Sequence, residues 1–416
     1  MSRSDWEQEA RRAQHQREEW AADVASRMRR ASQHTPSRRD LLKWMSAGAG
    51  ALAAAPLLAA CGKDDDTSSS PTSGSAGPTS TGAATTSTAP SVVSIPDGSG
   101  QTLVVSVWGG ETERAFKETV APVFKELTGA DVQFDTGSGG ERFNKLLAQA
   151  ASPSVDVFIN SGENVFQANS QGLLIDIDPA KVPNLSKIPD WAQLFPFGTS
   201  YGLLAYGIAR NEDLGALSSW TDLWRDDLQG KIGVPSIQGT QMPAFLITIA
   251  DLYGGSQDDI EPALRELAKL DPAVLVTFWG EYADRANSGE LQALTDFNYQ
   301  IVGAQDAGIP FVFDFPEEKA IAADNTVSIV KDRPNTDLAH AFLDVTLDAE
   351  VQTNFCGEWF GSPANVDATI APKIDGRVPL AADIIDKVRF FDLEFIASHR
   401  AEWTERLNAE VLPNWE

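Results

Sequence analysis

Short apolar runs alternate with longer amphipathic stretches through most of the chain after residue 100. Apolar runs at 103–108, 132–134 and 155–159 have the length of strands and are bounded by polar or glycine-rich segments. Between them, apolar residues recur at helical spacing at 112–127 and 140–151. This alternation of strands and helices predicts parallel strands covered by helices, which is an α/β fold.

The alternation continues toward the C-terminus without a repeating unit. The 316 residues from 101 to 416 are more than one hydrophobic core usually holds, so we expect two lobes. Further strands are predicted at 203–208, 231–234, 291–297, 311–315 and 326–330, and helices at 242–253, 260–270, 336–347, 349–359 and 382–391.

A second pattern lies near the N-terminus, where Arg38 and Arg39 precede an uncharged apolar stretch at 44–60 and then Cys61. The stretch has the length of a signal peptide and is shorter than the roughly 20 residues needed to span a bilayer. Residues 1–60 resemble a twin-arginine export signal joined to a bacterial lipobox, which implies cleavage before Cys61 and lipidation of that cysteine. A buried helix or a short membrane anchor is the alternative for 44–60.

Residues 61–100 are rich in Ser, Thr, Gly, Ala and Pro, with no large apolar side chain before Val92. Such a segment buries too little apolar surface to offset the entropy of ordering it, so we expect a disordered tether. The tether and the lipid would hold the folded part at the outer face of the cytoplasmic membrane or in the periplasm.

Charge and cysteine content exclude several classes of partner and crosslink. The chain carries a net charge of −26, and residues 1–60 are its basic part, so the mature protein is more acidic still. This charge disfavours nucleic acid and anionic lipid surfaces as partners. With Cys61 lipidated, Cys356 has no partner for a disulfide, and its apolar neighbours predict a small buried hydrophobic residue.

Motifs for catalysis or cofactor binding are scarce. After the signal segment the histidines are His340 and His399, neither with a companion at metal-ligand spacing. The glycine-rich segment 136–141 opens a helix and is expected to cap it rather than to bind a nucleotide. Neighbouring acids at Asp314 and 317–318 leave a carboxylate-based hydrolase as an alternative. We expect no cofactor and no metal.

Five segments in order carry a family resemblance: 105–111, 155–161, 172–178, 219–224 and 361–365. They resemble the extracellular solute-binding proteins of ABC importers, most closely the spermidine/putrescine-binding branch. The resemblance implies a type II periplasmic-binding fold, with lobe 1 at 101–207 plus 325–416 and lobe 2 at 208–324. It also implies a monomer that holds a small solute between its lobes, closes around it and docks on a membrane permease.

The resemblance also suggests cleft positions. Trp108 matches an aromatic wall, Ser161 matches a cleft serine, and Phe297 stands where a tryptophan is usual. Several inherited amine-binding acids are missing, since Ile237, Thr240 and Asn325 stand in their places, but other acids lie nearby. The full set of expected ligand-binding residues is Trp108, Glu111, Ser161, Glu163, Gln241, Asp296, Phe297, Asn298, Asp324 and Asn325.

These observations predict a lipid-anchored substrate-binding component of an ABC importer, with a small polar, cationic, polyamine-like ligand and no enzymatic activity. One alternative is a receptor for a sugar or a quaternary amine that uses Trp108, Phe297 and Trp279 as an aromatic cage. The other is the exported hydrolase.

Overall fold

A mixed sheet forms the centre of the fold. The structure is a computed structural model that describes residues 95–276 and 282–415, so Cys61, the signal segment and Trp279 lie outside the described residues. The principal strands follow in the spatial order β2 (Asp131–Thr136), β1 (Thr102–Val107), β3 (Val157–Asn160), β10 (Ala320–Val330), β5 (Thr199–Asn211), β8 (Ala293–Phe297), β6 (Ile232–Pro235) and β7 (Pro272–Val276). The strands at each end are parallel to one another, which confirms the predicted α/β class.

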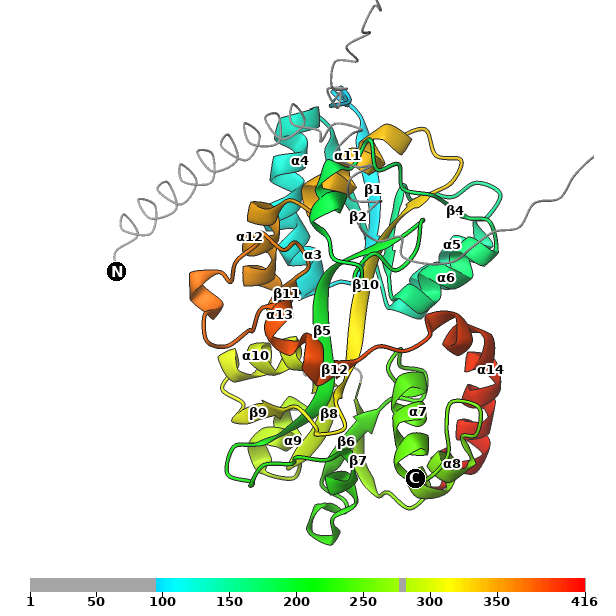
Figure 1. The fold of residues 1–416 in the computed structure, drawn as a ribbon, viewed down its shortest axis with the longest axis vertical. Helices are drawn as coiled ribbons and strands as arrows, with labels where there is room; N and C mark the ends of the chain where they lie inside the picture. Colours follow the sequence, from blue (N-terminus) through cyan, green and yellow to red (C-terminus); the bar gives the residue numbers. More distant parts are fainter. Residues whose placement is uncertain (1–94, 277–281, 416) are drawn as a thin grey trace, which may run out of the picture. The chain divides into compact units, whose positions relative to one another are not determined.

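Two long antiparallel strands, β5 and β10, run through both halves of this sheet (Figure 1). The later part of β10 pairs with β3, whereas the later part of β5 pairs with β8. We call the half with β1, β2 and β3 lobe 1 and the half with β6, β7 and β8 lobe 2. The predicted domain borders at 207/208 and 324/325 fall within β5 and β10.

Short strands extend the two long ones. β4 (Leu174–Ile175) and β12 (Val388–Arg389) pair with β10, and β9 (Phe311–Asp314) and β11 (Ser362–Pro363) pair with β5. β12 is therefore a third segment beside the crossing strands, and it brings the C-terminal part of the chain past the junction of the lobes.

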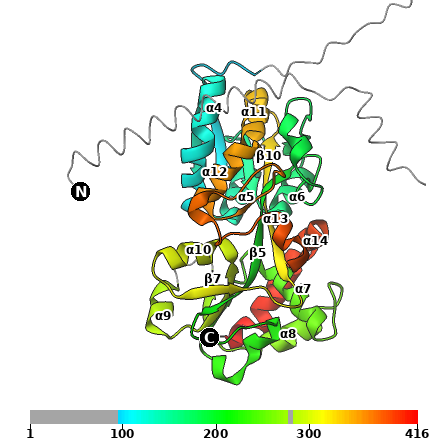
Figure 2. The ribbon, with the colours of Figure 1, turned by 60° about the vertical axis from the view of Figure 1, so that its left-hand side comes forward.

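Helices cover the sheet in each lobe (Figure 2). In lobe 1 they are α3 (Glu111–Ala115), a π-helical turn (Phe116–Val120), α4 (Ala121–Thr128), α5 (Gly139–Ala148), α6 (Gly162–Ser170), α11 (Thr336–Thr346) and α12 (Ala349–Trp359). In lobe 2 they are α7 (Met242–Leu252), α8 (Glu261–Leu267), α9 (Ala283–Ser288) and α10 (Asn298–Asp306), and the C-terminal segment adds α13 (Ala381–Ile384) and α14 (Leu393–Glu410).

Each lobe has its own hydrophobic core. In lobe 1, Phe116 packs against Phe355 with ring centroids 4.7 Å apart, and Cys356 is fully buried in the same cluster. The expectation that Cys356 is a small buried hydrophobic residue is confirmed. Burial also raises the pKa of the Cys356 thiol, which disfavours the reactive thiolate. In lobe 2, Trp220 and Phe245 pack at 5.6 Å in a second cluster.

The glycine-rich segment at 136–141 behaves as a helix cap. The Ser138 hydroxyl accepts a hydrogen bond from the Glu141 backbone N–H, and the Glu141 carboxylate accepts one from the Ser138 N–H. This reciprocal pair satisfies two N–H groups at the start of α5. The expectation that the segment caps a helix is confirmed.

The C-terminal segment differs from the expectation. The predicted helix at 382–391 ends early, because Val388 and Arg389 form β12 beside β10. After it, α14 places Ile396, Trp403 and Leu407 in the lobe 2 core and also packs against α6 of lobe 1. α14 therefore contacts both lobes, and the assignment of residues 325–416 to lobe 1 stays a prediction.

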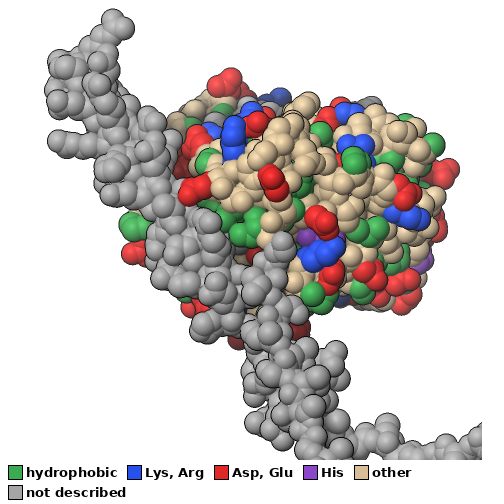
Figure 3. Space-filling model, turned by 90° about the horizontal axis from the view of Figure 1, so that it is seen from above, with side chains coloured by type: hydrophobic (Ala, Val, Ile, Leu, Met, Phe, Trp, Pro, Cys, Tyr) green, Lys and Arg blue, Asp and Glu red, His purple; other side chains and the backbone are tan. Residues whose placement is uncertain are grey.

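The described residues show neither a membrane-spanning helix nor a metal-ligand cluster. No helix in 95–276 or 282–415 is long and apolar enough to cross a bilayer. No group of three or more His, Cys, Asp or Glu side chains in the same ranges is arranged to hold a metal ion. On the face seen in Figure 3, acidic and basic side chains are interspersed rather than segregated.

Candidate functional site

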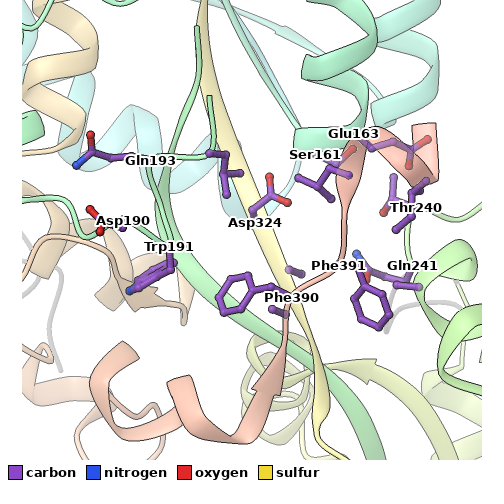
Figure 4. A pocket seen from close by; sticks show the side chains of 16 residues that line it. Ser161, Glu163, Asp190, Trp191, Gln193, Thr240, Gln241, Asp324, Phe390 and Phe391 are labelled. Carbon is purple, nitrogen blue, oxygen red and sulfur yellow. The ribbon is translucent and has the colours of Figure 1, made fainter. Parts of the chain in front are cut away.

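A pocket of about 320 Å³ lies where the two lobes, the crossing strand β10 and the C-terminal segment meet (Figure 4). Lobe 1 contributes the start of α6 and the loop before β5, and lobe 2 contributes the start of α7. The lining residues are Ser161, Glu163, Asp190, Trp191, Gln193, Leu194, Thr240, Gln241, Ala244, Ala322, Ala323, Asp324, Phe390, Phe391, Leu393 and Ile396.

Asp324 occupies the centre of the pocket in Figure 4, between Trp191 on one side and Ser161 on the other. The pairing of β10 with β5 shifts register between Asp324 and Thr326, and such irregularities re-aim side chains. The Asp324 Oδ2 atom accepts hydrogen bonds from the Gly162 N–H at 2.7 Å and the Thr326 hydroxyl at 2.6 Å. Burial raises the pKa of Asp324, and these two hydrogen bonds oppose the rise.

Glu163 lies in the first turn of α6 and is only 3% exposed. Its Oε2 atom is 2.7 Å from the Arg400 guanidinium of α14, and its Oε1 atom accepts a hydrogen bond from the Gln167 amide at 3.2 Å. Burial raises the pKa of Glu163, whereas the positive charge of Arg400 lowers it. The protein therefore supplies partners for both oxygens of this carboxylate.

Ser161 precedes α6, but its hydroxyl does not cap the helix. The Ser161 Oγ atom is buried and has no hydrogen-bond partner among the described residues. Buried polar atoms are almost always paired in folded proteins. This hydroxyl is therefore an available donor and acceptor at the pocket wall.

Aromatic side chains form the opposite side of the pocket. Trp191 and Phe390 lie with ring centroids 6.2 Å apart, and Phe390 is 43% exposed. The Arg389 guanidinium lies over the Phe391 ring, 4.5 Å from the ring centroid. Trp191 and Phe390 thus offer π-faces next to Asp324.

The ionisable residues that line the pocket are all acidic. They are the three carboxylates Glu163, Asp190 and Asp324, with no Lys, Arg or His among the lining residues. A desolvated cation is favoured where carboxylates and aromatic faces replace its water. The pocket is chemically suited to a positively charged group.

Comparison with known proteins identifies the family. Residues 119–376 match the family model described as bacterial extracellular solute-binding protein. The chain belongs to the bacterial extracellular solute-binding proteins.

Relatives with curated names include polyamine-binding proteins. The chain is 28% identical over 236 residues to spermidine/putrescine-binding periplasmic protein 1 of Haemophilus influenzae, covering 54% of this chain and 65% of that relative, which is slightly under two thirds of its length. It is 25% identical over 301 residues to the spermidine/putrescine-binding periplasmic protein of Escherichia coli, covering 69% of this chain and 82% of the relative.

Solved structures confirm the expected two-lobed periplasmic-binding fold. The crystal structure of an ABC transporter protein from Clostridium perfringens superposes with a TM-score of 0.65 at 26% identity, covering 74% of this chain and 99% of that one. This solute-binding protein is accordingly a transport protein of the ABC substrate-binding type.

Four of the expected ligand-binding residues line the pocket of this solute-binding protein: Ser161, Glu163, Gln241 and Asp324. The other six are Trp108, Glu111, Asp296, Phe297, Asn298 and Asn325, and they do not line it. Most of these six side chains form hydrogen bonds or ring contacts with other residues of the protein.

Asp296 shows this use of polar groups most clearly. It is 1% exposed, and its carboxylate accepts hydrogen bonds from the Tyr282 hydroxyl at 2.7 Å, the Phe297 N–H at 2.7 Å and the Gln300 amide at 2.9 Å. The Asn298 Oδ1 atom likewise accepts a hydrogen bond from the Ala205 N–H at 3.0 Å. These two side chains fix the end of β8 and the start of α10.

The aromatic residues outside the pocket are also engaged. The Arg142 guanidinium stacks on Trp108, 4.6 Å from the ring centroid, and burial lowers the pKa of Arg142 to about 10. One face of the indole is thus covered by a cation of the protein. Phe297 packs edge-on against Tyr206 with centroids 5.0 Å apart.

Two further predicted residues lie at structural junctions. Glu111 is the first residue of α3 and is half-buried. Asn325 is 8% exposed and sits at the register shift of β10, where its N–H donates to the Ser200 hydroxyl at 3.2 Å. The Ser200 side chain thereby replaces a backbone acceptor that the irregular pairing withdraws.

The acids that suggested a hydrolase are also held by the protein. Asp314 accepts hydrogen bonds from the Arg210 guanidinium at 2.7 Å and the Leu217 N–H at 3.0 Å. Glu318 accepts one from the Ser219 hydroxyl at 2.5 Å. Both carboxylates hold neighbouring loops in place.

Sequence reasoning missed the aromatic wall, which consists of Trp191, Phe390 and Phe391, and the rim acid Asp190. The predicted helix at 382–391 includes this aromatic pair, whereas in the structure residues 390–391 lie between β12 and α14. Asp392 is the signal in the sequence, because aspartate is a favoured N-cap residue, and Asp392 does cap α14.

Proposed function

We propose that this protein captures a small cationic, polyamine-like solute between its lobes and delivers it to an ABC permease, while a lipid on Cys61 keeps it at the membrane. The observation that carries the proposal is Asp324, a half-buried carboxylate in a pocket without lining basic residues. Its Oδ2 atom is hydrogen-bonded, and no described residue donates a hydrogen bond to Oδ1.

A cation at this carboxylate would relieve an electrostatic cost. Burial disfavours the ionised form of Asp324, as its raised pKa shows. An ammonium group would donate to the open Oδ1 atom and neutralise the charge, and charge-assisted hydrogen bonds of this type are stronger than neutral ones. The aromatic faces of Trp191 and Phe390 would cover the alkyl part and attract the charge.

The position of the pocket also suits a transport cycle. Its walls come from both lobes, and β5 and β10 are the strands that would bend when the lobes move. A ligand that contacts both lobes stabilises the closed arrangement relative to the open one. The similarity to proteins named as spermidine/putrescine-binding supports an amine as the solute.

A quaternary amine is the second candidate, and the Trp191–Phe390 pair favours it. Two aromatic faces beside a carboxylate are a common arrangement for quaternary ammonium groups, which donate no hydrogen bonds. The expected cage of Trp108, Phe297 and Trp279 is less suited, because Arg142 covers one face of Trp108.

Isothermal titration calorimetry of the purified protein with putrescine, 4-amino-1-butanol, choline and glucose tests the proposal. We expect an amine to bind and Asp324→Asn to weaken it by about 1.5–3 kcal/mol, the value of a hydrogen bond to a charged group. Asp176→Asn removes an exposed charge outside the pocket and is the matched control. Tightest binding of glucose, or equal amine affinity in Asp324→Asn, would contradict the proposal.

A further inference from the structure

Glu163 and Arg400 form an ion pair at the edge of the pocket that links segments far apart in the sequence. The Arg400 Nη1 atom is 2.7 Å from the Glu163 Oε2 atom. The Arg400 Nη2 atom donates to the backbone carbonyl oxygens of Gln238 at 3.0 Å and Gly239 at 3.1 Å. The guanidinium therefore joins α6 of lobe 1, the loop before α7 in lobe 2, and α14.

The pair is largely shielded from water. The Glu163 side chain is 4% exposed and the Arg400 side chain 20% exposed. Glu163 lines the pocket, whereas Arg400 stands behind it and is not a lining residue. A buried carboxylate of this kind needs a positive partner, and removing one member of such a pair costs far more than removing both.

Arg400 therefore changes the charge that the pocket presents to a ligand. Of the three lining carboxylates, Glu163 is neutralised by the protein, and Asp190 is exposed at the rim, where water screens it. Asp324 has no basic partner among the described residues. The shielded part of the pocket thus has one carboxylate for a ligand cation.

We infer that Arg400 is a specificity-determining residue, a built-in cation that takes the place of a second ligand ammonium at Glu163. The inference rests on the proposed function and narrows it to amines with one ammonium group in the pocket. The second ammonium of a diamine adds no binding free energy at Glu163 while Arg400 is present. That ammonium must stay in solvent or lie close to the Arg400 guanidinium, which repels it.

Two probes of equal length separate these cases. Putrescine and 4-amino-1-butanol share a four-carbon chain, and they differ in that putrescine carries an ammonium where the alcohol has a hydroxyl. Calorimetry on the wild-type protein should give the two affinities within about threefold, since the two equivalent ends of putrescine contribute only a small statistical advantage. In Arg400→Gln, putrescine should bind about tenfold tighter than the alcohol or more, because the freed Glu163 accepts its second ammonium.

Two variants distinguish this role from a structural one. Arg400→Lys keeps the positive charge and should retain the wild-type ratio of affinities. The double variant Glu163→Gln with Arg400→Gln removes both charges and should also show that ratio, because no second carboxylate is exposed to the ligand. Melting temperatures report whether each variant is folded.

If Arg400→Gln does not fold, Glu163→Gln decides the question. It leaves the Arg400 charge without its carboxylate partner beside the pocket, and both amines should then bind about tenfold weaker through like-charge repulsion. Unchanged affinity in Glu163→Gln would overturn the inference.

The outcomes also separate this inference from the proposed function. A wild-type preference for putrescine of about tenfold, or an unchanged ratio in folded Arg400→Gln, overturns the inference alone when Asp324→Asn still weakens amine binding. If neither amine binds the wild-type protein, the proposed function fails and the inference fails with it.

Discussion

The Gly162 backbone N–H donates a hydrogen bond of 2.7 Å to the Asp324 Oδ2 atom. This bond connects the start of α6 to the crossing strand β10 at the centre of the pocket. It directs one carboxylate oxygen toward the helix and leaves the other for a ligand. The positive end of the helix dipole favours a negative charge at this place.

Gly162→Ala should disturb this arrangement. A Cβ atom at residue 162 would lie 2.5 Å from the Leu393 Cδ1 atom and 3.0 Å from the Asp324 Oδ2 atom, so both side chains must move. We expect a loss of about 1–3 kcal/mol in the free energy of unfolding and weaker amine binding. Urea titration and calorimetry measure the two effects.

Gly140→Ala is the matched control for that substitution. Gly140 lies in α5, where an added Cβ atom meets nothing within 4 Å. We expect stability to be unchanged or to increase by up to about 1 kcal/mol, because alanine favours the helix, and amine affinity to stay the same. Equal behaviour of the two variants would argue against a tight fit at Gly162.

Amine affinity should fall as the pH is lowered, and it should begin to fall at a higher pH than an ordinary aspartate would cause. Burial raises the pKa of Asp324, and Glu163, the neighbouring carboxylate, also has a raised pKa. Alkylammonium groups stay protonated up to about pH 10, so the protein and not the ligand loses its charge. Calorimetry between pH 4 and 8 should show this loss in the wild type and not in Asp324→Asn, whose residual affinity should be flat apart from any effect of Glu163.

Asp344 should make the folded state less stable as the pH rises. Burial raises the pKa of Asp344 to about 7, against about 4 in an unfolded chain. Between these values the folded protein retains a proton that the unfolded chain releases, so the stabilising contribution is complete below about pH 4 and lost by about pH 7.

Asp344→Asn tests this dependence, because the amide still accepts the hydrogen bond from the Asn184 N–H that Asp344 Oδ1 accepts at 2.8 Å. We expect the variant to be about 1–3 kcal/mol more stable than the wild type at pH 8, with the difference shrinking toward pH 4. Thermal unfolding at several pH values measures it, with Asp176→Asn as a surface control. A constant difference across the range would refute the assignment to Asp344.

Cys61→Ser should release the protein from the membrane without altering its fold. The prediction rests on the sequence around Cys61, which lies outside the described residues. Stable anchoring takes two signals, such as two lipid chains, and the serine variant would carry no lipid. Membrane fractionation of cells that express each form, with amine binding as a check of folding, decides it; equal membrane association in both would contradict lipidation.

Much of the fold follows from local pattern. The predicted helix at 349–359 coincides with α12. Asp348 is its N-cap residue, and the Asp348 carboxylate accepts hydrogen bonds from the Glu350 and Val351 N–H groups. Capping and hydrophobic periodicity depend on residues a few positions apart, so a sequence displays them directly.

The site was predictable only in part. Ser161 and Glu163 reach the pocket because they follow β3, Gln241 because it follows β6, and Asp324 because it lies on the crossing strand β10. Asp296 has the same kind of position, but Tyr282 and Gln300 use its carboxylate. Which of two similar acids is left for a ligand depends on partners brought together by folding.

Local pattern along the chain predicts most of the strands, the two-lobed class, a helix cap at 136–141 and the burial of Cys356, because each depends on neighbouring residues or on total apolar content. The same pattern does not predict α6, α10 or α14. Tertiary structure alone decided that residues 388–389 pair with β10 and that Arg400 meets Glu163 across 237 positions of sequence. The physical reason is that the charge and solvation of a pocket depend on which distant groups share it, and only the folded chain brings those groups within hydrogen-bonding distance.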